Sequence, residues 1–76
     1  MKILILGSGC KNCKKLYQNT VLAVAELGLE VEVIKITDFA KISEYNVMQM
    51  PALVFDNKVV SKGKVLSKDE ILNMLK

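Results

Sequence analysis

A pair of cysteines three positions apart, at the junction of a short apolar run and a helical pattern, constrains this chain more than any other feature. Residues 2–6, which contain the run Ile-Leu-Ile-Leu, predict a buried strand that Gly7 ends, and residues 10–27 carry a helical pattern. Cys10 and Cys13 would then lie on one face of the first helical turn, close enough to form a disulfide. The unpaired N–H groups and the positive dipole end of that turn stabilise a thiolate, the nucleophilic form of cysteine.

The two cysteines are expected to take different roles. Cys10 stands at the mouth of the turn, where its sulfur can meet a partner, so it is the predicted nucleophile. Cys13 lies one turn further in, on the stripe of the helix that faces the core, so it is the predicted resolving thiol, which attacks Cys10 and releases the reduced partner. The chain has no histidine, which excludes a Cys–His hydrolase, and no carboxylate stands beside the motif to act as a base.

Lysines at the start of this helix oppose its dipole. Lys14 and Lys15 lie near the positive end of the helix, where an exposed charge of this sign costs roughly 0.3–1 kcal/mol at low salt. We hypothesise that these two residues and Lys11 add positive potential that favours the Cys10 thiolate. The alternative, three solvated lysines whose effect is screened by salt, remains open.

The rest of the chain predicts three more strands and two more helices. Gly28 ends the first helix, Asp56-Asn57 is a hairpin turn, and the Ser-x-x-Glu at residues 67–70 is a capping box that opens the last helix. After the first helix, the sequence predicts a strand at residues 31–36 and a short helix from residue 37 or 38 to about 45. Strands at residues 52–55 and 58–61 follow. The last helix has an apolar face made of Ile71, Leu72, Met74 and Leu75. The fold class is therefore α/β, with the order β-α-β-α-β-β-α and a mixed four-stranded sheet flanked by helices.

Some apolar residues between the second and third predicted strands are expected to be buried. In the short helix, Phe39 and Ile42, with Tyr45, should face inward. Met48 and Met50 are more often core fillers in such positions than ligands or substrate contacts.

Composition limits the class of protein. A length of 76 residues, 51% of them hydrophobic, leaves room for one small domain over residues 1–76. We see no signal peptide and no apolar stretch of membrane-spanning length, so we expect a cytoplasmic protein without a membrane partner.

The net charge of +3 arises from lysine without arginine, and there are two Phe, two Tyr and no Trp, so we expect no nucleic-acid partner. In a reducing compartment, two cysteines at this spacing are redox-active or metal-binding rather than a disulfide framework.

A single proline supplies a second signature. Pro51 opens the third predicted strand, where a residue that cannot donate to the ladder is tolerated. With Cys10-x-x-Cys13 after the first strand and Met50-Pro51 before the third, the chain resembles the thioredoxin superfamily. Within it, the chain is similar to the very small thioredoxin/glutaredoxin-like redox-disulfide proteins of archaea and bacteria. The resemblance implies a minimal thioredoxin-like fold, a cis Pro51 packed against the cysteine pair, and a substrate groove lined by Met50.

The chain departs from that superfamily's patterns at several positions. Lys11-Asn12 replaces the Gly-Pro of thioredoxins and the Pro-Tyr of glutaredoxins, and Gly9 stands where thioredoxins carry Trp. Met50 stands where glutaredoxins carry the valine of a Thr-Val-Pro that helps to bind glutathione. Of the Gly-Gly and Asp that follow the last strand in that family, only Gly63 remains. The use of glutathione and the identity of the electron donor are therefore open.

Together these features predict a thiol–disulfide oxidoreductase or redox carrier. Its active group would be the Cys10–Cys13 dithiol/disulfide, with no bound cofactor and no metal. Expected partners are a protein or small-molecule disulfide and a reductase that the sequence does not identify, and we expect a monomer. The expected substrate-binding residues are Gly9, Lys11, Asn12, Met50, Pro51 and Gly63.

Two other classes of function remain for comparison. Small βαββαβ copper and mercury carriers also place Cys-x-x-Cys after the first strand, and two thiolates suit a soft ion of the Cu(I) or Hg(II) type. Those carriers have Met two residues before the first cysteine, where this chain has Ser8, and they end in a strand. Nucleotide binding at residues 7–9 lacks the third glycine of the dinucleotide fingerprint, because Asn12 stands there. A metal carrier is therefore the alternative to the redox function.

Overall fold

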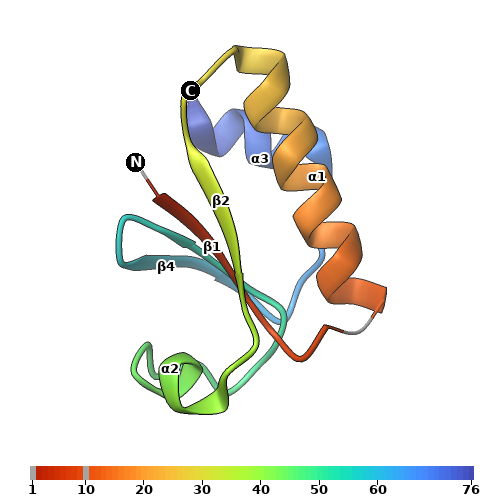
Figure 1. The fold of residues 1–76 in the computed structure, drawn as a ribbon. Coiled ribbons are helices and arrows are strands. Elements are labelled where there is room, and N and C mark those ends of the chain that lie inside the picture. Colours follow the sequence, from red (N-terminus) through yellow and green to blue (C-terminus); the bar gives the residue numbers. More distant parts are fainter. Residues whose placement is uncertain (1, 10) are drawn as a thin grey trace.

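The computed structural model describes residues 2–9 and 11–76. In this part of the chain the elements are, in order, β1 (Lys2–Leu6), α1 (Lys11–Leu27), β2 (Glu32–Ile36), α2 (Phe39–Ser43), β3 (Ala52–Phe55), β4 (Lys58–Lys62) and α3 (Lys68–Leu75) (Figure 1). The predicted order β-α-β-α-β-β-α is confirmed, and α2 is shorter than predicted. Among the described residues, we find no helix with the length and apolar character needed to cross a membrane.

The strands form one mixed sheet in the order β2-β1-β3-β4. β1 runs parallel to β2 and antiparallel to β3, and β3 pairs antiparallel with β4. Backbone hydrogen bonds continue the pairing beyond the strand ends, from Gly7 N to Ile36 O at 3.0 Å and from Gly63 N to Pro51 O at 2.9 Å. The end of β1, the entry to β3 and the exit from β4 therefore meet at one end of the sheet.

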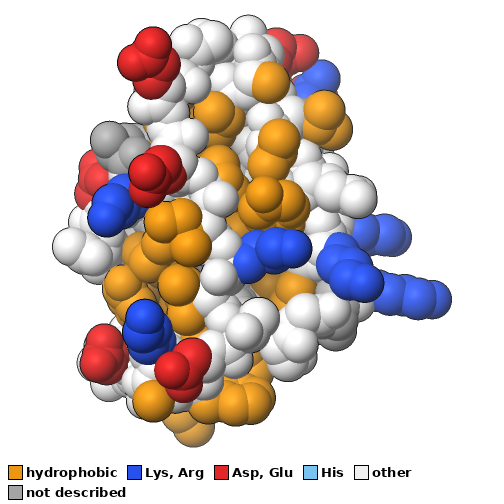
Figure 2. All heavy atoms as spheres, viewed as in Figure 1, with side chains coloured by type: hydrophobic (Ala, Val, Ile, Leu, Met, Phe, Trp, Pro, Cys, Tyr) orange, Lys and Arg blue, Asp and Glu red, His pale blue; other side chains and the backbone are white. Residues whose placement is uncertain are grey.

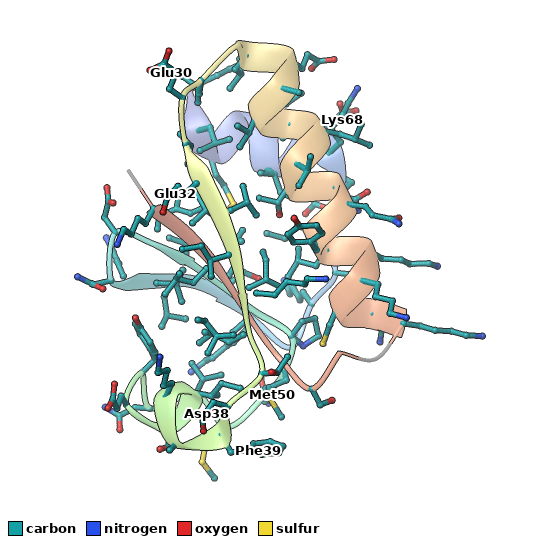
Figure 3. All side chains as sticks on the ribbon, in the orientation of Figure 1. Glu30, Glu32, Asp38, Phe39, Met50 and Lys68 are labelled. Carbon is teal, nitrogen blue, oxygen red and sulfur yellow. The ribbon has the colours of Figure 1, made fainter. Side chains whose placement is uncertain are left out.

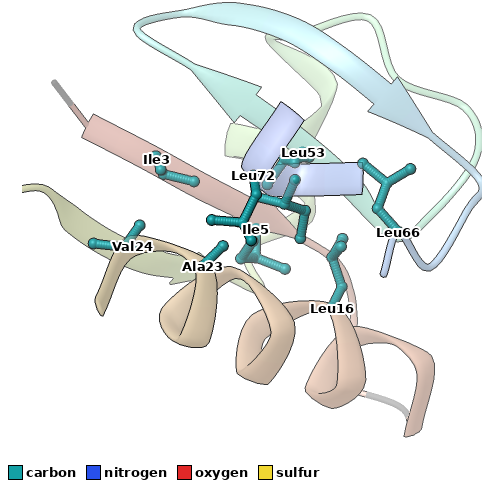
Figure 4. Close-up of a cluster of buried hydrophobic side chains, with 9 residues drawn as sticks. Ile3, Ile5, Leu16, Ala23, Val24, Leu53, Leu66 and Leu72 are labelled. Carbon is teal, nitrogen blue, oxygen red and sulfur yellow. The ribbon is translucent and has the colours of Figure 1, made fainter. Parts of the chain in front are cut away.

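One face of the sheet carries the larger core, under α1 and α3 (Figures 1 and 4). Residues at period 2 in β1, Ile3 and Ile5, point to this face and are 0% and 2% exposed. They meet the apolar stripe that α1 presents at helical spacing. The buried members of this cluster are Ile3, Ile5, Leu16, Ala23, Val24, Leu53, Leu66, Ile71 and Leu72.

The opposite face carries a smaller core, covered by α2. Its buried members are Leu6, Ile42, Val47, Ala52 and Val54. The prediction that Ile42 faces inward is confirmed, whereas the prediction for Phe39 is wrong, because that side chain is 64% exposed. β2 ends at Ile36, so the first residue of α2 lies beyond the end of the sheet and has no strand beneath it (Figure 3).

Local sequence signals end the elements as expected. Gly28 has φ +65°, and the bonds from Gly28 N to Ala25 O and from Leu29 N to Val24 O form a Schellman motif at the end of α1. Asp56 and Asn57 have φ +47° and +69°, the positive values that a tight hairpin turn requires.

Candidate active site

Cys13 and Gly7 lie against each other where β1 gives way to α1. Cys13 is in the first turn of α1 and is only 4% exposed. A Cβ placed on Gly7 would overlap the Cys13 Sγ, and it would lie 3.8 Å from the Pro51 Cα. Because any larger residue at position 7 would occupy the space of the sulfur, Gly7 is what lets Cys13 pack at the end of the sheet beside Pro51.

Pro51 is buried at the entry to β3, and the peptide bond between Met50 and Pro51 is cis, the isomer that the resemblance implied. Met50 is 38% exposed, so a side chain immediately before the proline reaches solvent (Figure 3). Met48 is 94% exposed, which contradicts its interpretation as a core filler. The segment that leads into β3 therefore presents apolar side chains to solvent at the same end of the sheet as Cys13.

Gly63 directly follows β4 and lies at the same end of the sheet as Pro51. Its φ is +72°, a left-handed backbone that favours glycine. A Cβ at Gly63 would lie 3.0 Å from Oε1 and 3.2 Å from Cβ of Gln49, so the Gln49 side chain already fills the space above this glycine. Gly63 is thus tied both to Pro51, through its backbone bond, and to the segment that precedes it.

The other expected site residues lie around the start of α1. Gly9 has φ +87° with open space where a Cβ would stand, so its role is to turn the backbone into the helix. Lys11 and Asn12 are exposed in the first turn, which contains no acidic residue. Cys10, the predicted nucleophile, lies outside the described residues.

The structure thus brings together Cys13, Pro51 and Gly63 and adds Gly7, whose contact with Cys13 the sequence did not predict. The sequence predicted only that Gly7 ends the first strand, but the space that Gly7 leaves for the Cys13 sulfur is the feature that matters. The available signal was its place directly after a buried strand and opposite the first helical turn. Within residues 2–9 and 11–76, no cluster of three His, Cys, Asp or Glu side chains is arranged to hold a metal ion.

Comparison with known proteins identifies the family. The family model of the thioredoxin domain matches residues 1–76. The chain belongs to the thioredoxin-domain family. This confirms the resemblance drawn from the cysteine pair and Pro51, and membership of the family supports a thiol–disulfide redox function in general.

Two archaeal relatives agree with that family assignment. A thioredoxin of Methanocaldococcus jannaschii is 42% identical over 74 residues, which are 97% of this chain and 85% of that protein. A thioredoxin of Methanothermobacter thermautotrophicus is 41% identical over 75 residues, which are 99% of this chain and 97% of that protein. This thioredoxin-domain chain therefore matches both relatives over nearly its whole length.

A solved structure supports the fold of this thioredoxin-domain protein. The structure, titled "Structure of a malarial protein", superposes with a TM-score of 0.72, covering 97% of this chain and 91% of that chain. Its sequence identity is 12%, so the likeness concerns the fold alone. The minimal thioredoxin-like α/β fold is confirmed.

Proposed function

We propose that this protein is a thiol–disulfide oxidoreductase that works through the Cys10–Cys13 dithiol, with Cys10 as nucleophile and Cys13 as resolving thiol. The observation that carries the proposal is the position of Cys13 in the first turn of α1, almost fully buried and packed against Gly7 beside Pro51. A sheltered thiol one turn into the helix suits attack on a neighbouring sulfur rather than on a partner in solution.

The proposed reaction transfers two electrons. The Cys10 thiolate attacks one sulfur of a substrate disulfide, a mixed disulfide forms, and the first substrate sulfur leaves as a thiolate that takes up a proton. Cys13 then loses its proton and attacks the Cys10 sulfur, which releases the second substrate thiol and leaves the Cys10–Cys13 disulfide. The substrate disulfide is reduced to two thiols, and an external dithiol or reductase restores the protein's own dithiol.

A metal carrier is the alternative use of the same cysteines. The order β-α-β-α-β-β-α, with α3 at the end, differs from the βαββαβ order of the small copper and mercury carriers. This difference favours the redox function. Tight stoichiometric binding of Cu(I) to the purified reduced protein, at the expense of disulfide formation, would favour the carrier instead.

A redox titration tests the proposed function. The metal-free protein is equilibrated in dithiothreitol and glutathione buffers, and thiols are counted by mass-tag alkylation. We expect a reversible two-electron transition of Cys10 and Cys13, within the range of about −270 to −120 mV spanned by related folds. A protein that forms no intramolecular disulfide would contradict the proposal.

A trapping experiment tests the two roles. Cys13→Ser should accumulate a mixed disulfide through Cys10, because the second attack is removed, whereas Cys10→Ser should not. Equal trapping by both variants would show that the roles are wrongly assigned.

A further inference from the structure

The surroundings of Cys13 and Pro51 are strongly basic on one side. Lys11, Lys14 and Lys15 are exposed in the first turns of α1, and Lys62 and Lys64 are exposed on either side of Gly63, whose backbone N–H binds Pro51. Figure 2 shows blue side chains gathered over the first turns of α1, at the right of the view and away from the red ones. Within the described residues none of these five lysines forms an ion pair, and the ion pair found there joins Lys68 and Glu26.

Much of the acidic charge lies at the other end of the sheet. Glu32 pairs with Lys2 at the start of the β1–β2 ladder, and the Asp56 carboxylate accepts a hydrogen bond from Lys2 N at 2.9 Å. Figure 3 shows Glu30 and Glu32 far from Met50. The far end carries charge of both signs, because Lys2 and Lys58 lie there with Glu32 and Asp56. The lysines on the α1 side of the Cys13 end are therefore the part of the molecule that attracts anionic partners.

The other side of Pro51 is apolar. Met48 and Phe39 are 94% and 64% exposed, and Met50 is 38% exposed. Phe39 and Met50 lie at the same end of the molecule (Figure 3). Asp38 and Glu44 flank this side, on either end of α2, so the acidic part of a partner would be directed toward the lysines of α1 instead.

We propose that the substrate of this protein is a polypeptide disulfide flanked by acidic residues, held by the five lysines on one side of Pro51 and by Phe39, Met48 and Met50 on the other. The proposal rests on the proposed function and names the class of substrate for the same site. Opposite charge raises the rate of encounter, and the apolar side chains supply contact area that a polypeptide can cover.

The test compares three oxidised substrates with the reduced protein. They are a synthetic peptide with an internal disulfide flanked by glutamates, the same peptide with lysines in place of the glutamates, and glutathione disulfide. At low ionic strength we expect the acidic peptide to oxidise the protein about tenfold faster than the basic one, at the lower end of the range for electrostatic steering. The ratio should fall as salt is added, because screening weakens exposed charges.

A pair of matched variants locates the effect. The test variant combines Lys14→Glu and Lys15→Glu, and it should reduce the ratio of the acidic-peptide rate to the basic-peptide rate severalfold. The control variant combines Lys58→Glu and Lys76→Glu. It changes the net charge by the same amount and should leave the ratio unchanged. Lys58 opens β4 opposite Phe55, and Lys76 follows α3, both distant from Pro51. A change in thiolate reactivity would alter both rates alike, so the ratio isolates recognition from chemistry. Lys14→Gln with Lys15→Gln provides a milder variant if charge reversal disturbs folding.

The outcomes separate the two proposals. If neither peptide nor glutathione disulfide oxidises the dithiol, the proposed redox function fails. If all three substrates react but the two peptides do so at equal rates, or the control pair shifts the ratio as much as the α1 pair, the proposed substrate class is wrong. Glutathione disulfide reacting faster than the acidic peptide would also overturn it, since the site would then select a small anionic disulfide.

Discussion

Gly7 shows how one missing side chain can place a reactive group. Its Cα faces the Cys13 sulfur, and the space that a Cβ would fill is taken by that sulfur. Gly9, two residues later, is needed for its positive φ instead, with open space around it. Two glycines of the same loop thus serve different purposes, one steric and one conformational.

Replacing Gly7 tests this steric role. Gly7→Ala should lower the free energy of unfolding by about 1–3 kcal/mol, the usual cost of overpacking a buried site. In a Cys13→Ala background the sulfur is gone and the Cys13 Cβ stands at 3.5 Å, an ordinary contact, so the same change should be neutral or stabilising by about 0.4–1 kcal/mol. Urea unfolding of the reduced proteins measures all four forms. A similar loss in both backgrounds would disprove the steric explanation.

For single residues, the sequence predicted which residues lie together better than which ones are exposed. The family resemblance implied that Pro51 packs near the cysteines, and the structure has Cys13 and Pro51 on either side of Gly7 at one end of the sheet. The predictions that Phe39 and Met48 are buried were wrong. Both rested on apolar character, and the sequence does not show where the sheet ends. The contact between Gly63 and Gln49 joins two segments by tertiary structure, which local patterns do not encode.

Among the elements, α3 has its first turn fixed by side-chain hydrogen bonds. Ser67 accepts a hydrogen bond from Glu70 N at 3.2 Å, and the Glu70 carboxylate accepts one from Ser67 N at 3.2 Å, so the predicted capping box is present. The loop before it is fixed by Asn19 Nδ2, which donates to Leu66 O at 2.9 Å. Two adjacent residues, Leu66 and Ser67, therefore anchor α3 to α1 and cap its first turn.

Removing the cap should weaken the whole protein. Ser67→Ala should cost about 0.5–2 kcal/mol of unfolding free energy, because the Glu70 N–H loses the Ser67 hydroxyl as its partner. Ser43→Ala is the control, since the Ser43 hydroxyl donates to Ala40 O on an exposed helix and caps nothing, and its effect should stay within about 0.5 kcal/mol. Thermal or urea unfolding compares the two, and equal effects would mean that the box contributes no special stability.

An ion pair joins α1 and α3 and makes stability depend on pH. Lys68 Nζ lies 3.0 Å from Glu26 Oε1, and the hydrogen bond and charge of Glu26 raise the pKa of Lys68 above 10.5. Because the folded pKa is the higher one, the contribution is complete below pH 10.5 and is lost as pH rises through the folded value. Glu26→Gln should show a smaller loss of unfolding free energy over that alkaline interval. Identical pH profiles would contradict this.

For the whole molecule, the two cores on opposite faces of the sheet are unequal. The larger is covered by two helices, and the smaller by the five residues of α2. A chain of this length has only roughly 4–11 kcal/mol of stability in total, at the usual value per residue. A single buried side chain can therefore decide whether the protein folds.

Matched substitutions of isoleucine compare the two cores. Ile71→Ala, in the larger core and 0% exposed, should cost near the upper end of the usual 2–5 kcal/mol. Ile42→Ala, 3% exposed and within the one-turn helix α2, should cost near the lower end, because a short helix can move to fill the space. Denaturant midpoints measure both, and a larger loss for Ile42→Ala would reverse the assignment of the main core.

The order of the elements could be predicted because each has a local signal, such as the Gly28 end of α1, the Asp56-Asn57 turn and the Ser67 cap. The strand order β2-β1-β3-β4 could not be derived from those signals, since it depends on which strands pair at a distance. The gathering of lysines was equally hidden, because Lys62 and Lys64 reach the end of the sheet that carries Cys13 only through the bond from Gly63 N to Pro51 O.

The strand order leaves β2 and β4 at the edges of the sheet, and β4 is irregular there. Ser61 pairs with Leu53 and Val59 with Val54, so Val60 is an extra residue that interrupts the ladder, and lysines stand at both ends of the strand. An edge that is bulged and positively charged is a poor template for strands of other copies. At high concentration, this outer strand therefore protects the protein against edge-to-edge aggregation.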